Sequence, residues 1–236
     1  MHKIGIPDDV MARIIARRGR LHPFARLEGP KAALVVIDLQ NGFMLPGMPT
    51  EVKTARDIVP NVNRLARAVR AAGGKVVWVK MTLDGERQSW SVLFDHFGSA
   101  EHSAAEMQAL SRGSSGHELY DGLDVKPTDL VVEKTRFSAF IQGSSDLDTR
   151  LRQLGIDTVL IAGTVTNTCC ESSARDAMML NYKVVMVSDA NAAHSDDEHN
   201  ATLVNMIRMF GDVLTTDEVE DGLGVAARRE KASSSA

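Results

Sequence analysis

Short apolar runs alternate along this chain with segments of helical periodicity, and that alternation limits the possible folds more than any other feature. Six runs are expected to form strands: 32–38, 75–80, 129–133, 158–162, 183–188 and, shortest, 212–215. Runs that are apolar throughout suit strands buried on both faces of a parallel sheet. Because connections between parallel strands are right-handed, the sequence predicts an α/β fold. It would be a single-domain, doubly wound (Rossmann-like), mainly parallel sheet of about six strands with helices on both faces.

The chain length allows one sizeable core. Its 236 residues are 44% hydrophobic, which suits one α/β domain and leaves little room for a second. We therefore expect an N-terminal extension with a short helix (1–30), one α/β domain (31–225) and a small polar tail (226–236) that is disordered. The extension carries a basic amphipathic segment, 10–20, expected to pack on the domain or on a neighbouring subunit; a membrane-surface helix is the alternative.

Charge and cysteine content narrow the partners and the compartment. The net charge is −4 and no block of Lys or Arg lies beside aromatic residues, so nucleic acid is not an expected partner. No apolar run approaches the ~20 residues of a membrane span, and no membrane partner is expected. The two cysteines are adjacent and cannot staple a secreted fold. These features predict a soluble, cytoplasmic protein.

The stretch from Thr158 to Leu180 is the strongest candidate for chemistry. An apolar strand, a glycine and a small polar turn lead into a helix, and Cys169 falls at or just inside the first helical turn. Helix N-termini favour a thiolate and can lower a thiol pKa from roughly 8.5 to about 3.5–7.5. Cys169 is thus a candidate nucleophile, although a cysteine beside a strand commonly just packs. Cys170, on an apolar helical stripe, is expected in the core; a vicinal disulfide is the alternative.

Two charged residues are expected to meet that cysteine. Asp38 follows the first apolar run and Lys134 follows the third, while Cys169 comes just past the fourth. The carboxyl ends of parallel strands share one edge of a sheet, where open α/β folds place their ligands. A carboxylate can take the thiol proton, an ammonium can stabilise the thiolate, and backbone N–H groups can hold an oxyanion. The three residues together predict nucleophilic catalysis.

Other residues near these strand ends are candidates for shaping a pocket. The long segment 82–124 looks irregular and is expected to cover the site, because such segments are often lids. Packing or turn formation would explain each pocket candidate equally well. The predicted substrate-binding residues are Gln40, Phe43, Trp90, Phe137 and Asn167.

Three motifs resemble the signatures of the isochorismatase-like cysteine hydrolases. They are D-L-Q-N-x-F (38–43), K-x-x-x-S-A-F (134–140) and G-T-x-T-N-x-C-C-E-S-S-A-R-D-A (163–177), in the order and spacing of that superfamily. The resemblance covers about 32–214. The superfamily includes nicotinamidases and hydrolases of N-carbamoylsarcosine, ureidoacrylate and biuret. The form C-C-E-S-x-A-R-D-A-M is most similar to the branch that hydrolyses ureides and carbamoyl amides.

The resemblance implies a site and a reaction. It implies an Asp38–Lys134–Cys169 triad, a cis peptide between Thr164 and Val165, and an oxyanion hole formed by the N–H groups of Val165 and Cys169. The implied activity is cysteine-dependent hydrolysis of a C–N bond in a small linear amide or ureide through a thioester, with release of ammonia or an amine. A dimer or tetramer is also implied.

The sequence does not favour a metal site, and it leaves two alternative functions open. Nicotinamidases of this superfamily carry an Asp-x-His motif after the second strand, whereas 80–86 of this chain contains no histidine. His194 and His199 could suggest a metal site, but a helix cap explains them better, and no metal or other cofactor is expected. Two alternatives stay open: a vinyl ether hydrolase in which Cys169 is a bystander, and a non-catalytic scaffold or thiol redox sensor.

Overall fold

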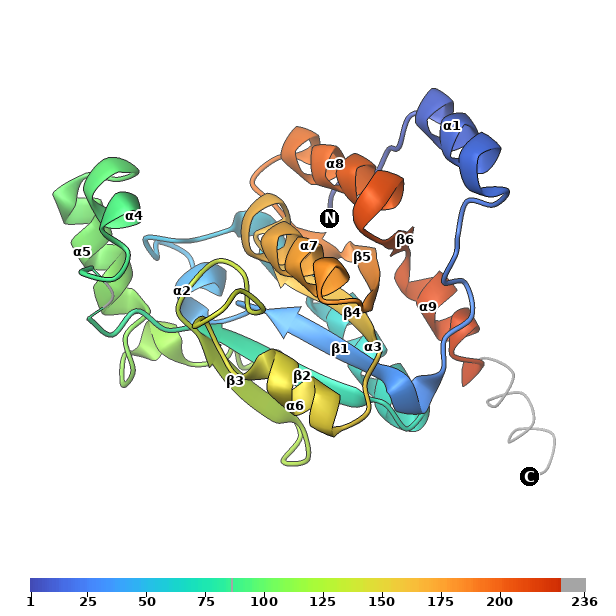
Figure 1. The fold of residues 1–236 in the computed structure, drawn as a ribbon. Coiled ribbons are helices and arrows are strands. Elements are labelled where there is room, and N and C mark those ends of the chain that lie inside the picture. Colours follow the sequence, from blue (N-terminus) through green and yellow to red (C-terminus); the bar gives the residue numbers. More distant parts are fainter. Residues whose placement is uncertain (86, 226–236) are drawn as a thin grey trace.

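Six parallel strands form one sheet in the computed structural model, which describes residues 1–85 and 87–225 (Figure 1). All five strand pairings are parallel and the strand order is β3-β2-β1-β4-β5-β6. The predicted α/β fold is therefore confirmed. The chain runs outward from β1 to β3, returns to the other side of β1, and continues to β6. The strands are β1 (Ala32–Ile37), β2 (Lys75–Met81), β3 (Leu130–Lys134), β4 (Thr158–Thr164), β5 (Lys183–Ala192) and β6 (Asp212–Leu214).

Helices cover both faces of this sheet, as a doubly wound topology requires. One face packs against α3 and α9, and the other against α1, α6, α7 and α8. The helices are α1 (Asp8–Arg18), α2 (Asn41–Met44), α3 (Val59–Ala71), α4 (Ser91–His96), α5 (Ala100–Ala109), α6 (Leu147–Gln153), α7 (Glu171–Met179), α8 (Asp196–Asn205) and α9 (Thr216–Gly222).

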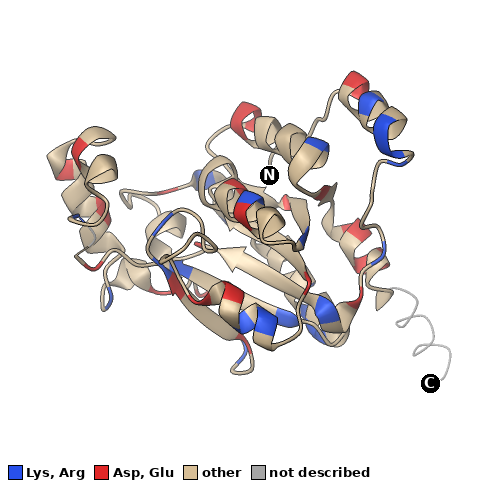
Figure 2. Ribbon diagram, in the orientation of Figure 1, with Lys and Arg blue, Asp and Glu red and all other residues tan. Residues whose placement is uncertain are grey.

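The central strand β1 divides its side chains between two hydrophobic cores. Leu34 and Val36 belong to one core, whereas Val35 and Ile37 belong to the other. This division follows from the two-residue period of a strand, and it explains why the run is apolar at every position. In Figure 2 the ribbon of β1 carries no charge, while acidic and basic residues are interspersed on the surrounding helices.

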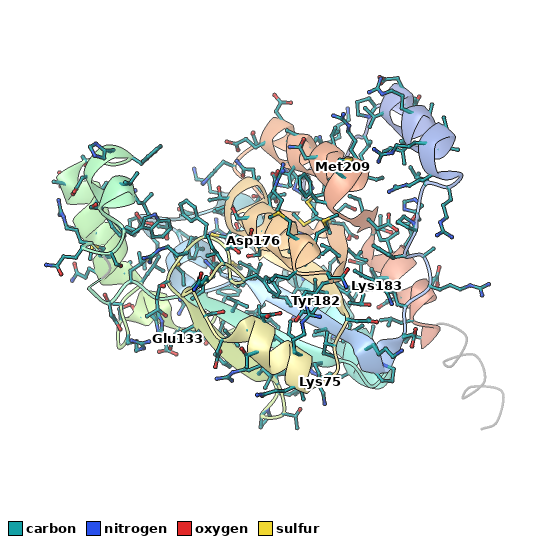
Figure 3. All side chains as sticks on the ribbon, in the orientation of Figure 1. Lys75, Glu133, Asp176, Tyr182, Lys183 and Met209 are labelled. Atoms are coloured by element: carbon teal, nitrogen blue, oxygen red, sulfur yellow. The ribbon has the colours of Figure 1, made fainter. Side chains whose placement is uncertain are left out.

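Helix ends follow the local signals of the sequence. Asn181, after α7, has φ +70°, a left-handed conformation that Asn tolerates at the end of a helix. Ser195 caps α8 by accepting from the Glu198 N–H at 3.2 Å. Lys183, labelled in Figure 3, begins β5 at the amino edge of the sheet. Its ammonium lies 3.0 Å from the Asp157 carboxylate.

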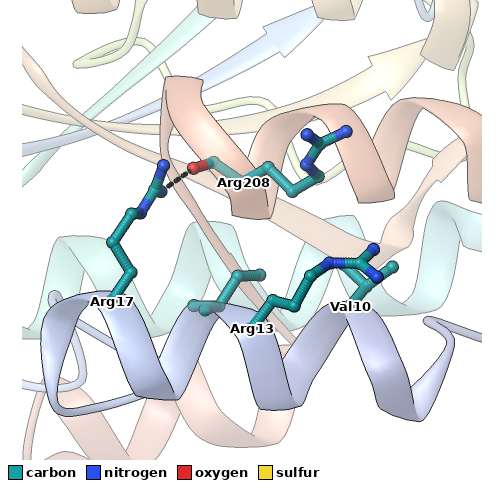
Figure 4. A pocket seen from close by; sticks show the side chains of 5 residues that line it. Val10, Arg13, Arg17 and Arg208 are labelled. Carbon is teal, nitrogen blue, oxygen red and sulfur yellow. Dashed lines mark hydrogen bonds between the residues drawn. The ribbon is translucent and has the colours of Figure 1, made fainter.

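The N-terminal helix α1 packs against the domain. Val10 and Ile14 are buried in the core that includes α8, whereas Ile15 is exposed because it lies about 100° further round the helix than Ile14. Arg17 fixes this contact by donating to the Arg208 carbonyl (Figure 4). Among the described residues, no helix is both long enough and apolar enough to cross a bilayer.

The segment 82–124 is more regular than its sequence indicates. It contains α4 and α5, which stand to one side of the sheet, in the direction in which β1 points (Figure 1). The only buried residue of α5 is Ser103, whose hydroxyl donates to the Phe94 carbonyl at 3.1 Å. Since α5 packs no apolar stripe into the core, it has no clear helical periodicity for sequence analysis to detect.

Candidate active site

Three side chains predicted to meet do so at the carboxyl edge of the sheet. Asp38 directly follows β1, Lys134 is the last residue of β3, and Cys169 lies in a turn shortly after β4. Asp38 has φ +56°, in the left-handed region that Asp adopts more readily than most residues, and this ends the strand. The parallel sheet thus brings together residues that are far apart in sequence.

Lys134 lies between the acid and the thiol. Its Nζ is 2.9 Å from Asp38 Oδ2 and 3.6 Å from Cys169 Sγ. Nζ also donates to the Arg136 carbonyl at 3.1 Å, so Asp38 and Cys169 share one ammonium that is also bound to a backbone oxygen. Asp38 and Lys134 are fully buried and Cys169 is 3% exposed. The cluster is therefore held by charge-assisted hydrogen bonds in a site with little water.

Burial dominates the electrostatics of the cluster. Burial raises the pKa of Asp38, although the Lys134 ammonium opposes this shift. Burial is also the largest single effect on Lys134 and disfavours its cation, but Asp38 and Cys169 together outweigh burial and raise the pKa of Lys134. These opposing effects are those expected for an acid–ammonium pair removed from water.

The pKa of the Cys169 thiol shifts in the direction opposite to our expectation. Burial raises the pKa of Cys169 above its usual range, against the stabilising Lys134 ammonium and with the help of the Asp38 charge. The lowered pKa expected at a helix N-terminus is therefore wrong, because that argument left out the loss of solvent. Burial thus favours the protonated thiol, and Asp38 is the adjacent group placed to accept its proton.

The turn that carries Cys169 is a π-helical turn, Thr166–Cys170, directly before α7. It follows a cis peptide between Thr164 and Val165, which confirms that implication of the resemblance. Ser173 ties the turn to the loop after β3: its hydroxyl donates to the Cys169 carbonyl at 2.7 Å and accepts from the Ala139 N–H at 3.0 Å. Cys170 is fully buried, and both thiols are free.

A cavity of about 310 Å³ opens above Cys169. Such a volume suits a small molecule. The wall combines residues from the loop after α2, from α5, from the cysteine turn and from the start of the β5–α8 connection. Its lining residues are Phe43, Pro49, Thr50, Glu51, Met81, His102, Glu106, Phe137, Val165, Thr168, Cys169 and His194.

Two of the five predicted substrate-binding residues line this cavity: Phe43 and Phe137. Gln40 does not, because its amide is fully buried and bound to the backbone: it accepts from the Met81 N–H at 2.6 Å and donates to the carbonyls of Met81 and His117. Gln40 therefore braces the ends of two strands and has no donor to spare for a substrate.

Trp90 and Asn167 also lie outside the wall of this cavity. Trp90 lines an adjoining cavity and packs edge-on against Phe137, with ring centroids 4.7 Å apart. Trp90 therefore contacts the cavity wall through Phe137 and does not line the cavity itself. Asn167 is exposed on the outer side of the cysteine turn.

Sequence analysis missed the polar residues of the wall. His102 and Glu106 are four positions apart on α5, so they lie on one helical face and both reach the cavity. Glu51 comes from the loop after α2, and His194 precedes α8. Only the i, i+4 spacing of His102 and Glu106 could have pointed to a shared helical face. Nothing in the sequence indicated that this face would point toward the cavity.

The two histidines weighed as metal ligands have separate environments. His194 is exposed at the cavity, whereas His199 is fully buried and its Nδ1 lies 2.9 Å from the Thr166 hydroxyl. Within residues 1–85 and 87–225, no three His, Cys, Asp or Glu side chains are grouped so that they could hold a metal ion.

Comparisons with known proteins define the class. Residues 32–218 match the family model of the isochorismatase domain. The chain therefore belongs to the isochorismatase family of hydrolases, as its motifs indicated.

Individual relatives cover most of the chain. A probable inactive nicotinamidase of Arabidopsis thaliana is 36% identical over 176 residues, 74% of this chain and 87% of the relative. The ureidoacrylate amidohydrolase RutB of Methylobacterium radiotolerans is 30% identical over 223 residues, 89% of this chain and 85% of the relative.

Solved structures share the fold. A cysteine hydrolase from Pseudomonas syringae pv. phaseolicola has a TM-score of 0.76 and 31% identity, covering 85% of this chain and 95% of that one. An N-carbamoylsarcosine amidase from Thermoplasma acidophilum has a TM-score of 0.63 and 28% identity, covering 79% and 97%.

Proposed function

We propose that this protein is a cysteine-dependent amidohydrolase that cleaves a C–N bond of a small linear amide or ureide. The observation that carries the proposal is the buried cluster of Asp38, Lys134 and Cys169 at the base of a cavity of about 310 Å³. Similarity to a ureidoacrylate amidohydrolase and an N-carbamoylsarcosine amidase supports the type of bond that is cleaved, a ureide or amide C–N bond.

The first half of the proposed reaction forms a covalent intermediate. Asp38 takes the thiol proton of Cys169 as Sγ attacks the substrate carbonyl carbon, and the C=O electron pair moves to oxygen. The N–H groups of Val165 and Cys169 are the proposed donors to that oxyanion. When the tetrahedral intermediate collapses, the C–N bond breaks and Asp38 returns its proton to the departing nitrogen. The product is ammonia or an amine, and a thioester (a thiocarbamate from a ureide) remains on Cys169.

The second half releases the acyl group. Asp38 removes a proton from water, the hydroxide attacks the thioester carbonyl, and the C–S bond breaks. The proton held by Asp38 then returns to the thiolate. Lys134 stays protonated throughout: its Nζ reaches both Asp38 and Cys169, so it can stabilise negative charge on either as the proton moves.

Ammonia release tests this proposal. The substrates would be biuret, N-carbamoyl amino acids, ureidoacrylate analogues, nicotinamide and simple amides, assayed with Cys169→Ala and with Cys170→Ala as the matched control. Cys170 neighbours the nucleophile but does not line the cavity. We expect Cys169→Ala to lose on the order of a thousandfold or more in turnover, because a nucleophile cannot be bypassed, and Cys170→Ala to stay within a few fold.

The covalent step has its own readout. Acid quenching during turnover, followed by mass spectrometry, should find the acyl group on the peptide that contains Cys169. Ammonia release that survives Cys169→Ala would contradict the proposal, because the C–N bond would then break without a cysteine nucleophile. Silence of all amides and ureides, together with cleavage of a vinyl ether that survives Cys169→Ala, would favour the vinyl ether alternative. Silence across the whole set of substrates, with reversible peroxide oxidation of the thiols, would favour the redox alternative.

A further inference from the structure

The charges on the cavity wall indicate which substrates can enter. Among the described residues that line the cavity, two are carboxylic acids, Glu51 and Glu106, and none is Lys or Arg. A substrate carboxylate would therefore approach two acids and no Lys or Arg; the only other basic side chains of the described lining are the imidazoles of His102 and His194.

The nearby cations are already engaged. Lys134 lies behind Cys169 and is paired with Asp38 at 2.9 Å. Arg56 is paired with Glu51 at 2.9 Å and also donates to the Met44 carbonyl. Neither cation therefore offers an unpaired charge to a substrate anion.

Arg136 serves the adjoining cavity. It lines that cavity, and its guanidinium donates to the carbonyls of Thr135 and Ser89 at 2.7 and 3.0 Å. It is also not among the residues around the Cys169 cavity. A carboxylate held near Cys169 would thus lack the bidentate guanidinium partner that proteins commonly use for carboxylates.

The two acids differ in how their charge is balanced. The Glu51 carboxylate accepts from the Gly47 N–H at 2.9 Å and from Arg56, and these bonds lower its pKa. Among the described residues, no Lys or Arg forms an ion pair with Glu106, and burial raises its pKa while the neighbouring His102 acts in the opposite direction. Glu106 is therefore the acid of the wall that lacks a fixed partner, and its oxygens are available to N–H donors.

We propose that Glu106 makes the cavity selective for ureides and amides that are uncharged or cationic, and against those that carry a carboxylate. This inference rests on the proposed amidohydrolase function. The N–H groups of a urea or the ammonium of a cationic tail can donate to the Glu106 carboxylate, whereas a substrate anion is repelled. Glu106 lies on α5, a helix that packs little into the core. The residue that sets the substrate preference would therefore belong to the segment 82–124, and not to the sheet.

Substrates matched in shape and different in charge test this selectivity. The ureides would be 3-ureidopropionate (anionic), propylurea (neutral) and (2-aminoethyl)urea (cationic), and the amides succinamate, butyramide and 3-aminopropanamide. We expect wild-type kcat/KM for the neutral and cationic members to exceed that for the anion by at least about tenfold. This magnitude corresponds to a partly screened charge–charge repulsion over several ångströms.

Three variants separate charge from shape. Glu106→Gln, which keeps the shape, should reduce the discrimination against the anion by about tenfold. Glu106→Asp, which keeps the charge, should retain most of it. Glu101→Gln removes the same charge from the first turn of α5, outside the cavity lining, and should leave the ratio unchanged.

The outcomes distinguish the inference from the function on which it rests. Turnover in which wild type prefers the anionic members, or a ratio that Glu106→Gln leaves unchanged, would overturn the selectivity and leave the amidohydrolase intact. If wild type turns over neither series nor any other amide or ureide tested, the result would contradict both the amidohydrolase function and the selectivity. Binding of the three ureides to Cys169→Ala, measured by calorimetry, should follow the same order of preference without any chemical step.

Discussion

Lys134 Nζ lies 2.9 Å from Asp38 Oδ2 with both side chains fully buried, so each charge depends on the other for compensation. Removing one member of such a pair leaves a buried charge without a partner, which typically costs about 3–5 kcal/mol. The same pair joins β1 to β3 across the intervening strand β2, and it sets the charge beside Cys169.

Lys134→Met should therefore lower the free energy of unfolding by about 3–5 kcal/mol and abolish hydrolysis. Urea denaturation would measure the loss. The control is Lys183→Met, which breaks a surface pair with Asp157 and should cost less than about 1 kcal/mol. The double variant Asp38→Asn with Lys134→Met should recover much of the stability but none of the activity. Equal losses for Lys134→Met and Lys183→Met would contradict the compensation argument.

The Asp38 charge also raises the pKa of the Cys169 thiol, so its removal should make the thiol more acidic. In Asp38→Asn the Lys134 ammonium would act on the thiol unopposed. We expect alkylation of Cys169 by iodoacetamide at pH 7 to be at least about tenfold faster than in wild type, which corresponds to one pKa unit. Peptide mass spectrometry would assign the label, with Cys169→Ala reporting any reaction at Cys170. A slower reaction in Asp38→Asn would show that the carboxylate promotes thiolate formation in the resting enzyme.

The strands and the meeting of Asp38, Lys134 and Cys169 could be predicted from sequence because both depend on local patterns joined by one topological rule. Apolar runs located the strands, and the shared edge of parallel strands brought Asp38, Lys134 and Cys169 together. The wall of the cavity could not be predicted in this way. Gln40 has the polar amide of a ligand-binding residue, yet that amide is hydrogen-bonded to the backbone of Met81.

The missed features depend on tertiary burial. Glu106 lies on a helix whose position is not encoded in an apolar stripe, so neither the helix nor its inward acid was visible in the sequence. The pKa of Cys169 was predicted in the wrong direction for a related reason. A helix end can be recognised locally, whereas the exclusion of water from a thiol depends on residues brought in from the whole fold.

Gly163 sets the close approach of β4 to β1 next to the site. It has φ +120°, and a Cβ there would lie 2.0 Å from the Ile37 carbonyl oxygen. Gly163→Ala should cost about 3 kcal/mol or more, because rigid backbone must move. Gly143→Ala is the matched control: its φ is +80° with no atom within 4 Å of the added Cβ, so only the conformational cost of about 1–2 kcal/mol is expected. Similar unfolding free energies for the two variants would contradict the steric argument.

His199 should make the protein sensitive to acid. It is fully buried and stacks on His2 with ring centroids 4.4 Å apart, and its Nδ1 lies 2.9 Å from Thr166 Oγ1 in the cysteine turn. Burial, with a smaller contribution from His2, lowers the pKa of His199 from 6.5 to about 4. As pH falls below the unfolded-state value, the unfolded chain binds the proton first, so the stability present above about pH 6.5 is lost progressively toward pH 4.

Comparison with a variant that cannot titrate isolates this contribution. Between pH 7 and pH 4.5, wild type should lose about 2–3 kcal/mol more unfolding free energy than His199→Gln does over the same interval, as follows from the lowered pKa. Urea denaturation at several pH values would measure both losses. His194→Gln removes an exposed histidine five positions earlier and should follow the wild-type curve. Parallel curves for wild type and His199→Gln would mean that His199 titrates alike in both states, and the acid sensitivity would then have to come from the buried carboxyl groups.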